Sequence, residues 1–489
     1  MSAPVLWTTQ DAVAATDGRA VGQWRATGVA IDSRTVAPGD LFVAIRGPNF
    51  DAHDFVAEAL ARGAVAALVH RPPPGVAADA PLLTVDDTLE GLTALGRFAR
   101  LRSRARVAAV TGSVGKTSTK EALRLALAAE AKTYASAGNL NNHWGVPLSL
   151  ARLPPACVFA VFELGMNHAG EIAPLSRLVK PEVAIITGVE AVHLENFPSV
   201  DAIADAKAEI FAGMSPAGAA VLNRDNRYFP HLVAHARTQG LSRIWSFGEH
   251  PQCDARLDEC ALFATGSVGR AVIRGEPIDF TLSVPGKHWV LNGLAVLLAV
   301  KALGGDMATA ARALNQFAPM KGRGAARRVV LDRAGARGAF VLIDESYNAS
   351  PTSVTAALAV LGQTAPQGQG RRIAVLGDML ELGPEAVDLH RSLATAIRAN
   401  GVEAVYACGP LMTALMDDLP PALRGAHAPD SAALADIVAD AVRPGDVVLV
   451  KGSLGSRMAT VIAALDRLDA AAARPTNDDR PPRLAVNGG

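Results

Sequence analysis

The 489-residue sequence has little of what marks several large classes of protein. Aromatic residues make up 5% of it, and none of its cysteines forms a C-x-x-C pair. We therefore expect unpaired thiols in a reducing compartment rather than a disulfide framework or a zinc site. The 47 basic and 47 acidic residues leave no net charge that would attract nucleic acid. The cysteines are Cys157, Cys253, Cys260 and Cys408.

Long hydrophobic runs are also missing. The longest apolar stretch, at 289–300, is interrupted by Asn292 and Gly293 and is too short to span a bilayer. The N-terminal segment MSAPVLWTTQDA has neither the basic start nor the apolar core of a signal peptide. The sequence therefore predicts a cytoplasmic protein without membrane insertion.

Apolar residues account for 50% of the chain. That share, with abundant Ala, Val, Leu and Gly, is typical of α/β layers, and the length exceeds what one hydrophobic core supports. Changes in pattern divide the chain into regions at 1–103, 104–320 and 321–470, followed by a tail at 471–489. We predict three α/β domains and a disordered tail.

Apolar strand patterns alternate with amphipathic helices in the second and third regions. This alternation predicts parallel sheets with helices on their faces, which bind ligands at the carboxyl ends of their strands. Candidate strands of the second region are 107–110, 132–135, 157–162, 183–187 and 219–222. Those of the third region are 339–343, 372–376, 402–407 and 446–450.

The segment 107–119, VAAVTGSVGKTST, is the most informative one. An apolar strand runs into a glycine turn, and a helix is predicted from Thr117 to about residue 130. Backbone N–H groups at such a turn bind polyphosphate, with Lys116 reaching the β- and γ-phosphates and the Thr117 hydroxyl holding Mg²⁺. Val110 replaces the first glycine of the strict P-loop pattern. Predicted nucleotide contacts are Gly112, Ser113, Gly115, Lys116, Thr117 and Ser118.

Further polar residues follow other predicted strands. Glu163 follows the strand at 157–162, and a carboxylate there suits Mg²⁺, which prefers one or two carboxylates plus phosphate oxygens. His193 comes after the strand at 183–187, and Lys207 lies on a predicted helix. Taken alone, that histidine would be structural and that lysine solvated. Asn139 and Asn142, in the loop AGNLNNHWGVP, would by default form turns.

Together these segments resemble the Mur ligases, ATP-dependent amino-acid or peptide ligases of peptidoglycan synthesis. The resemblance extends in order from Asp32 to about residue 458. It implies a small α/β domain for a uridine nucleotide, a central ATP-binding domain with a P-loop-type parallel sheet, and a C-terminal Rossmann-like α/β domain. The segments that carry it are SVGKTSTK, AGNLNNHWGVP, FELGMNHAGEI, HLENF and DESYNASP.

The resemblance implies ATP, two Mg²⁺ ions and a carbamylated Lys207 as cofactors. A carbamylated lysine is a carboxylate, which explains a lysine beside cations that would repel an ammonium. The implied metal ligands are Thr117, Glu163, His193 and Lys207. The implied catalytic residues are Lys116, His193, Lys207 and Arg323.

Contacts to ATP and substrates are implied in the same way. Asn292 would lie beside the adenine, and Asp344 would belong to a loop that closes on the ribose. Arg323 would contact the γ-phosphate, but Arg327 and Arg328 are close in sequence, so which of the three arginines makes this contact stays open. The implied substrate contacts are Ser33, Arg34, Asn139, Asn142, Tyr347 and Asn348.

Within the family, the segments IDSRTVAPGDLFVAIRG, ELGMNHAGEI, DESYNASP and GDMLELG favour one activity. It is the addition of D-alanyl-D-alanine to UDP-N-acetylmuramoyl-tripeptide through an acyl phosphate, by a monomer. The Asn-Pro-Arg motif of the ligase that adds the third stem-peptide residue is missing from the sequence. Another Mur-type amino-acid ligase, a folylpolyglutamate synthase and an ATPase without ligase chemistry remain alternatives, and the third residue of the acceptor peptide stays open.

Overall fold

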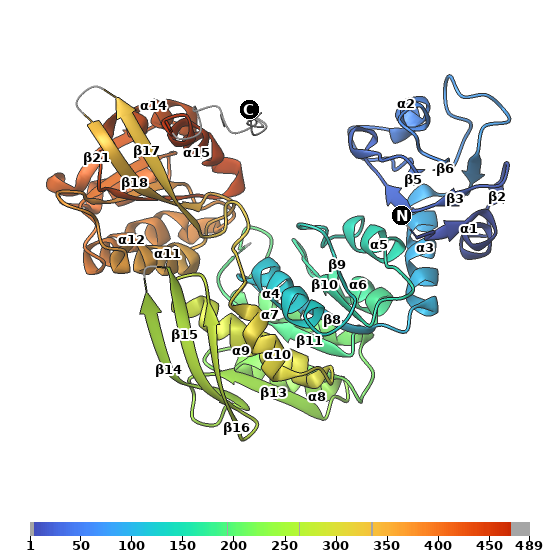
Figure 1. The fold of residues 1–489 in the computed structure, drawn as a ribbon, viewed down its shortest axis with the longest axis horizontal. Coiled ribbons are helices and arrows are strands. Elements are labelled where there is room, and N and C mark those ends of the chain that lie inside the picture. Colours follow the sequence, from blue (N-terminus) through green and yellow to red (C-terminus); the bar gives the residue numbers. More distant parts are fainter. Residues whose placement is uncertain (1–3, 193, 264, 334–335, 471–489) are drawn as a thin grey trace, which may run out of the picture. The chain divides into compact units, whose positions relative to one another are not determined.

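The computed structural model describes residues 4–192, 194–263, 265–333 and 336–470. The chain divides after Phe317 into two compact units. The first unit contains a five-stranded and a nine-stranded sheet, and the second contains a six-stranded sheet (Figure 1). Helices pack on these sheets, so the α/β class predicted from the sequence is confirmed. Among the described helices, none combines the length and apolarity needed to cross a membrane.

The five-stranded sheet comes first in the chain and has the strand order β2-β7-β6-β5-β4. Strands β4 to β7 run parallel, while β2 is antiparallel at the edge. Strands β1 and β3 of the same region pair with each other in a separate two-stranded sheet. The elements of this region are β1 (Trp7–Thr8), α1 (Thr9–Thr16), β2 (Arg19–Ala20), β3 (Arg25–Ala26), β4 (Gly28–Ala30), β5 (Asp40–Val43), α2 (Val56–Ala61), β6 (Ala66–Val69), β7 (Leu82–Thr84) and α3 (Thr88–Arg102).

Long-range contacts join this N-terminal region to the rest of the first unit. The indole Nε1 of Trp7 donates a hydrogen bond to the carbonyl of Ala151 at 2.8 Å. Arg152 Nε donates to the carbonyl of Val29 at 2.6 Å, and helix α3 packs against α5. These long-range bonds explain why the first two sheets belong to one compact unit.

The nine-stranded sheet has the order β16-β15-β14-β13-β12-β11-β8-β10-β9. Its strands from β9 to β14 are parallel. Alternate residues of β8 enter opposite cores, because successive side chains of a strand point to opposite faces. Val107 and Ala109 pack with α5, α6 and α7, whereas Ala108 and Val110 pack with α4, α9 and α10. Burial on both faces gives the continuous apolar runs seen in the sequence.

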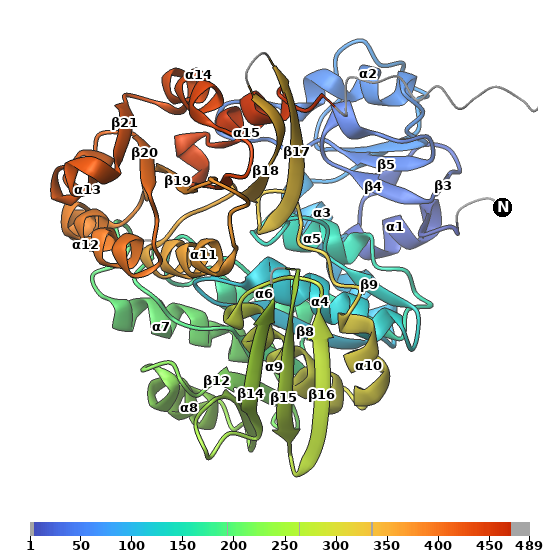
Figure 2. The ribbon, with the colours of Figure 1, turned by 60° about the vertical axis from the view of Figure 1, so that its left-hand side comes forward.

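Strands β14, β15 and β16 extend this sheet as an antiparallel ribbon (Figure 2). The sequence analysis did not predict them, because one of their faces is exposed and their buried residues alternate with polar ones. The elements of this region are β8 (Arg106–Thr111), α4 (Lys116–Ala128), β9 (Thr133–Ala135), α5 (Gly145–Ala151), β10 (Phe159–Glu163), α6 (Ile172–Val179), β11 (Val183–Ile186), α7 (Val200–Ala208), β12 (Ala219–Asn223), α8 (Phe229–Thr238), β13 (Arg243–Gly248), β14 (Ala255–Phe263), β15 (Gly266–Ile273), β16 (Glu276–Leu282), α9 (Lys287–Ala302) and α10 (Met307–Leu314).

The second unit is built on a six-stranded sheet of order β17-β18-β22-β19-β20-β21. Strand β17 is antiparallel to β18, and the other pairs are parallel. The four strands predicted here correspond to β18, β19, β20 and β22. The elements are β17 (Ala325–Arg333), β18 (Ala336–Glu345), α11 (Pro351–Gln363), β19 (Arg372–Gly377), α12 (Ala386–Ala399), β20 (Ala404–Cys408), α13 (Met412–Asp418), β21 (Arg424–Ala428), α14 (Ser431–Ala441), β22 (Val447–Lys451) and α15 (Ala459–Asp466).

Candidate active site

The predicted phosphate turn lies between β8 and α4. Gly115 forms the N-cap of the helix with φ of 82°, and Gly112 has φ of 145°. A Cβ atom on Gly112 would lie 2.0 Å from Oγ1 of Thr187, so only glycine fits this close approach. That same Oγ1 atom donates a hydrogen bond to the carbonyl of Val114 at 2.5 Å. The end of β11 therefore fixes the turn from one side.

Side chains of the turn are held by its own backbone and by the segment after β11. Lys116 Nζ donates to the carbonyl of Gly112 at 2.7 Å, which folds its side chain over the turn. The hydroxyl of Ser113 exchanges hydrogen bonds with the backbone of Glu190, at 3.2 and 2.9 Å. The ammonium is thus placed where a phosphate bound by the turn would meet it.

The first turn of α4 points its backbone N–H groups toward the same place. Thr117 is buried there and Ser118 is half-buried. Close by, the hydroxyls of Thr111 and Thr119 are buried, and neither has a hydrogen-bond partner in the described structure. A helix N-terminus with unused donors and a lysine makes an anion-binding site.

Glu163 is the last residue of β10 and pairs in register with Val110 of β8. Only 1% of its surface is exposed. One carboxylate oxygen, Oε1, accepts a hydrogen bond from Asn141 Nδ2 at 2.7 Å, while Oε2 is buried and has no partner among the described residues. Burying an unpaired carboxylate oxygen is costly. A divalent cation would satisfy it, so this residue fits a magnesium site.

Lys207 lies near the C-terminus of α7 and is 2% exposed. Burial, and then the charge of Lys116, lower the pKa of its ammonium well below the usual value. Within the described ranges no carboxylate pairs with its Nζ atom. His193, the other predicted ligand here, lies outside the described residues. The structure thus places two lysines within electrostatic reach of each other beside the phosphate turn.

Three predicted asparagines have different surroundings. Asn292, on α9, borders the turn, because a Cβ on Gly115 would lie 3.2 Å from its Nδ2 atom. Asn139 is exposed in the loop after β9. Asn142 Oδ1 accepts the backbone N–H of Gly145 at 2.9 Å and so starts helix α5, as a turn-forming asparagine does.

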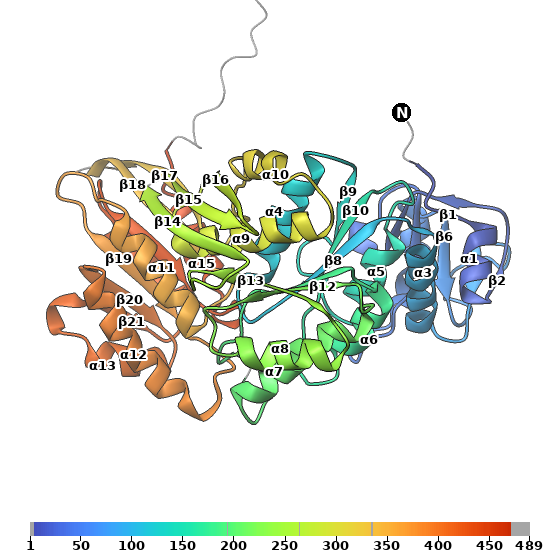
Figure 3. The same cartoon turned by 90° about the horizontal axis from the view of Figure 1, so that it is seen from below.

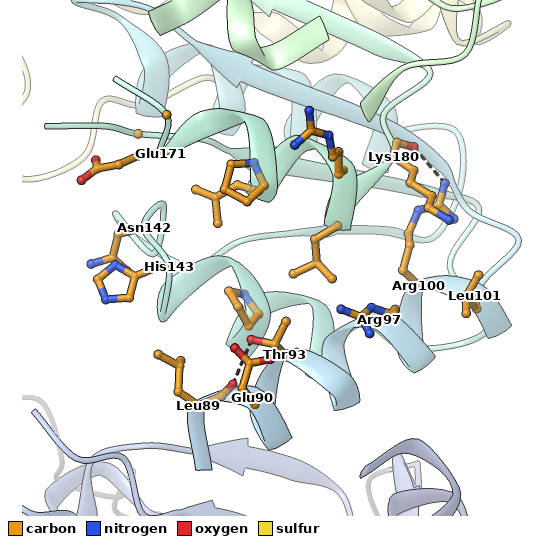
Figure 4. Close-up of a pocket in the computed structure, with 17 residues that line it drawn as sticks. Leu89, Glu90, Thr93, Arg97, Arg100, Leu101, Asn142, His143, Glu171 and Lys180 are labelled. Atoms are coloured by element: carbon orange, nitrogen blue, oxygen red, sulfur yellow. Dashed lines mark hydrogen bonds between the residues drawn. The ribbon is translucent and has the colours of Figure 1, made fainter. Parts of the chain in front are cut away.

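The loop that carries Asn142 also borders a cavity of 720 Å³ between α3, α5 and α6 (Figure 4). In Figure 4, Arg97, Arg100 and Lys180 lie at one end of it, and Glu171 and Asn142 lie at the other. Arg100 Nε donates to the carbonyl of Val179 at 2.7 Å, which fixes that arginine in the wall. The excess of cationic side chains suits an anionic ligand next to the loop that contacts Glu163.

Ser33 and Arg34 lie in a short 3₁₀ helix after β4, capped by Asp32. The guanidinium of Arg34 binds both carboxylate oxygens of Asp32, at 2.9 and 2.6 Å. This hydrogen bonding lowers the pKa of Asp32. Ser33 is buried, whereas 83% of the arginine side chain is exposed. Arg34 thus has exposed N–H groups available for a phosphate while its orientation is fixed.

In the second unit, Asp344 is fully buried at the end of β18. Its Oδ1 atom accepts from the backbone N–H and the hydroxyl of Ser346, at 3.1 and 2.6 Å, and its Oδ2 atom accepts from Gly322 N–H at 3.1 Å. The guanidinium of Arg323 lies 4.0 Å from the centre of the Tyr347 ring. The carboxylate therefore holds together the two loops that present Arg323 and Tyr347.

The remaining residues predicted for the second unit differ in their hydrogen bonds and exposure. Asn348 accepts a hydrogen bond at its carbonyl from Lys451 Nζ at 3.0 Å. Arg327 Nε donates to Asp466 at 3.1 Å, so its guanidinium is held on the strand. Arg328 is exposed.

Two contact residues were not predicted. Asn141 binds Glu163 directly, although the sequence analysis singled out its neighbours Asn139 and Asn142. Thr187 fixes the phosphate turn. The sequence does contain a run of asparagines around Asn141 and a threonine at a strand end, Thr187. Neither pattern indicates which residue the side chain contacts in the folded protein.

A phosphate-binding turn beside a buried, unpaired carboxylate oxygen at the carboxyl edge of a parallel sheet defines a nucleotide-dependent α/β enzyme. The chain belongs to the Mur ligase family. Residues 25–100 match the model of the Mur ligase family catalytic domain, residues 110–300 the Mur ligase middle domain, and residues 327–454 the Mur ligase glutamate ligase domain.

Full-length relatives agree with these matches. UDP-N-acetylmuramoyl-tripeptide–D-alanyl-D-alanine ligase of Rickettsia prowazekii is 34% identical over 439 residues, which cover 89% of this chain and 94% of that one. A crystal structure of MurF from Acinetobacter baumannii aligns with a TM-score of 0.81 and 32% identity, over 94% of this chain and 99% of that one. MurF from Thermotoga maritima, solved in complex with ADP, aligns with a TM-score of 0.73 and 27% identity, over 90% and 97%.

Proposed function

We propose that this protein uses ATP to join D-alanyl-D-alanine to UDP-N-acetylmuramoyl-tripeptide, giving UDP-N-acetylmuramoyl-pentapeptide, ADP and phosphate. The observation that carries the proposal is the similarity to ligases of that name along nearly the whole chain, through all three domains. The phosphate turn and the buried carboxylate beside it support the ATP-dependent step.

The chemistry explains why such a ligase needs ATP. A carboxylate is a poor acyl donor, because its leaving group would be oxide. Transfer of the γ-phosphoryl group of ATP to the carboxylate of the tripeptide gives an acyl phosphate and ADP. The amine of D-alanyl-D-alanine then attacks the acyl carbon, and a tetrahedral intermediate collapses to the amide with loss of phosphate.

The chain's own residues contribute positioning and charge to these steps. Lys116 and the N–H groups of the turn would hold the β- and γ-phosphates, and Thr117 and Glu163 would present oxygens to the cation. Bound magnesium would neutralise phosphate charge during the transfer. The proposed contact of Arg323 with the γ-phosphate rests on the family resemblance.

Lys207 would act as a carbamate. Its neutral amine would add to CO₂ with release of one proton, and the product is a carboxylate. Burial without a partner carboxylate among the described residues supports this, because a buried ammonium beside Lys116 is electrostatically unfavourable. A carbamate would instead attract a second magnesium, for which His193 is the other proposed ligand.

Location and assembly are further parts of the proposal. We infer that the protein works in the cytoplasm as a monomer, on small-molecule substrates and without nucleic acid. Its 47 basic and 47 acidic residues leave no net charge that would attract a polyanion.

The test is phosphate release by the purified protein with MgATP and UDP-N-acetylmuramoyl-tripeptide, with and without D-alanyl-D-alanine. Release that requires the dipeptide, with a product heavier by the dipeptide minus water, supports the proposal. Release driven by a free amino acid or by glutamate would instead assign a sister ligase or a folate enzyme. Release that needs no acceptor would assign an ATPase.

A further inference from the structure

Helices α7 and α8 pack side by side in the first unit (Figure 3), and three potential metal ligands converge between them. Asp205 comes from α7, and His231 and His235 come from α8. We propose that these three residues form a binding site for a divalent transition-metal cation, with Zn²⁺ as the ion that fits best. The site is independent of the proposed ligase function.

The helix geometry preorganises the ligands. His231 and His235 are four residues apart, so their side chains lie on one face of α8. Their Nε2 atoms lie 2.7 and 2.8 Å from the same oxygen, Oδ1 of Asp205. The ring centroids are 4.9 Å apart, and the three ligand atoms all lie within 4.8 Å of one another.

These distances need only a small adjustment to accept a metal. Tetrahedral Zn²⁺ with bonds of about 2.0–2.1 Å separates its ligand atoms by about 3.3 Å. Each contact from Nε2 to the shared oxygen would therefore open by about half an ångström, and the two Nε2 atoms, which lie within 4.8 Å of each other, would take up the same separation. Rotation of the three side chains supplies that movement, because 53% of Asp205, 37% of His231 and 41% of His235 is exposed.

The donor set selects the class of cation. Two imidazole nitrogens and one carboxylate oxygen suit Zn²⁺ and the neighbouring late transition metals, whereas Mg²⁺ prefers oxygen ligands alone. No other group of three or more His, Cys, Asp or Glu ligands with this convergence occurs in the part of the chain that the structure describes. Exposure leaves the remaining coordination positions to water.

The site lies on the far side of α7 from the phosphate turn. Asp205 and Lys207 are two residues apart, which rotates them by about 200° around the helix. Accordingly, Lys207 is buried beside Lys116 while Asp205 is exposed toward α8. A bound cation would thus cross-link α8 to the helix that carries Lys207 without occupying the phosphate site.

The test is a calorimetric titration of the nucleotide-free, full-length protein with ZnCl₂, repeated with Co²⁺ while its visible absorption is recorded. The variants are Asp205→Asn, which keeps the shape and an acceptor oxygen, and the double variant His231→Gln/His235→Gln. His250→Gln, at an exposed histidine outside the cluster, is the matched control. All variants keep the four cysteines, so thiol binding cancels in the comparison.

We expect one Zn²⁺ per chain at this site. Loss of an outer-sphere partner alone weakens metal binding by about 10–100-fold, so removing a direct ligand should raise Kd by at least about tenfold. The visible absorption of bound Co²⁺ should disappear in the variants that lack a ligand, and His250→Gln should bind both metals as the wild type does. Equal affinity in the wild type and in both cluster variants, with unchanged circular dichroism, would overturn the proposal, as would saturation only at millimolar metal.

Discussion

The carboxyl edges of the two large parallel sheets differ in how their polar side chains are used. At the edge of the nine-stranded sheet, Glu163 Oε2 is buried without a hydrogen-bond partner among the described residues. Lys207, on the neighbouring helix α7, is buried without a carboxylate partner in the same ranges. At the edge of the six-stranded sheet, Asp344 uses both of its oxygens on its own loops. Lys451 there pairs with Glu345 at 3.0 Å.

Asp378 repeats the pattern of the second edge. Its carboxylate accepts the N–H groups of Leu411 and Met412 at 3.3 and 2.9 Å and so caps α13. A polar residue at a strand end is therefore weak evidence for a ligand. Polar atoms that stay unsatisfied after folding are stronger evidence, because a bound ligand offsets their burial cost. The first edge keeps a buried polar atom that a ligand could satisfy, whereas Asp344 and Asp378 at the second edge are satisfied by their own loops.

The strongest test of this difference is Lys116→Ala at the first edge. We expect turnover to fall by roughly 10²–10³-fold, as it does when a single charge-stabilising group is removed. The folded structure should persist, because the hydrogen bonds of the Lys116 ammonium to the carbonyls of Gly112 and Ser113 lie within its own turn. Steady-state phosphate release with MgATP and both substrates measures the effect. The exposed Lys132→Ala is the control, and unchanged turnover in Lys116→Ala would refute the assignment.

The next test concerns the two buried lysines. Lys207→Ala should lower the rate by about 10²-fold, and short carboxylates such as acetate should restore part of it by replacing the carbamate. Lys451→Ala is the matched variant at the other edge. Its ammonium already pairs with Glu345, so added carboxylate should not restore what that variant loses. Full activity of Lys207→Ala at limiting magnesium would contradict the carbamate.

The first edge was the easier one to predict from the sequence. An apolar strand, a glycine turn and Lys116-Thr117 are adjacent in the chain, so local pattern alone predicts β8, the turn and α4. The pairing of Asn141 with Glu163 joins residues 22 positions apart, and no local pattern specifies which asparagine of the loop faces the carboxylate.

Other features depend on tertiary contacts in the same way. The antiparallel strands β14–β16 have one exposed face and therefore lack the continuous apolar runs that indicate a parallel strand. The family resemblance implies that Asp344 belongs to a ligand-binding loop, and only the fold adds that its oxygens accept hydrogen bonds from Ser346 and Gly322. The spacing of His231 and His235 is visible in the sequence, but their partner Asp205 comes from another helix.

Two isosteric substitutions, one at each edge, should change different properties of the protein: magnesium dependence at the first edge and stability at the second. Glu163→Gln should raise the magnesium concentration needed for half-maximal activity by about tenfold or more, with little change in stability, since the lost oxygen had no protein partner. Asp344→Asn should instead cost about 1–3 kcal/mol of unfolding free energy, because an amide brings donors toward N–H groups. Urea unfolding and magnesium titrations measure both. A stability loss at Glu163 as large as that at Asp344 would contradict the comparison.

The smallest expected effect is a pH dependence in the second unit. His390 is buried, its Nε2 atom accepts the backbone N–H of Met379 at 2.9 Å, and burial lowers its pKa below the usual value. Between that lowered pKa and about 6.5, the unfolded chain binds a proton that the folded chain does not. This residue's contribution to stability is therefore complete above about pH 6.5 and declines below it by at most about 1.4 kcal/mol per pH unit.

His390→Gln removes the titrating group from the same position. The wild type should be more stable than the variant at pH 7.5, and the difference in unfolding free energy should narrow at pH 5.5. Urea unfolding at both pH values measures the gap. If the difference in unfolding free energy stays constant or widens on acidification, the buried imidazole can be protonated without loss of stability. The hydrogen bond from Met379 to the His390 imidazole would then not depend on the neutral ring. The contrast between satisfied polar groups at the second edge and unsatisfied ones at the first would be weaker.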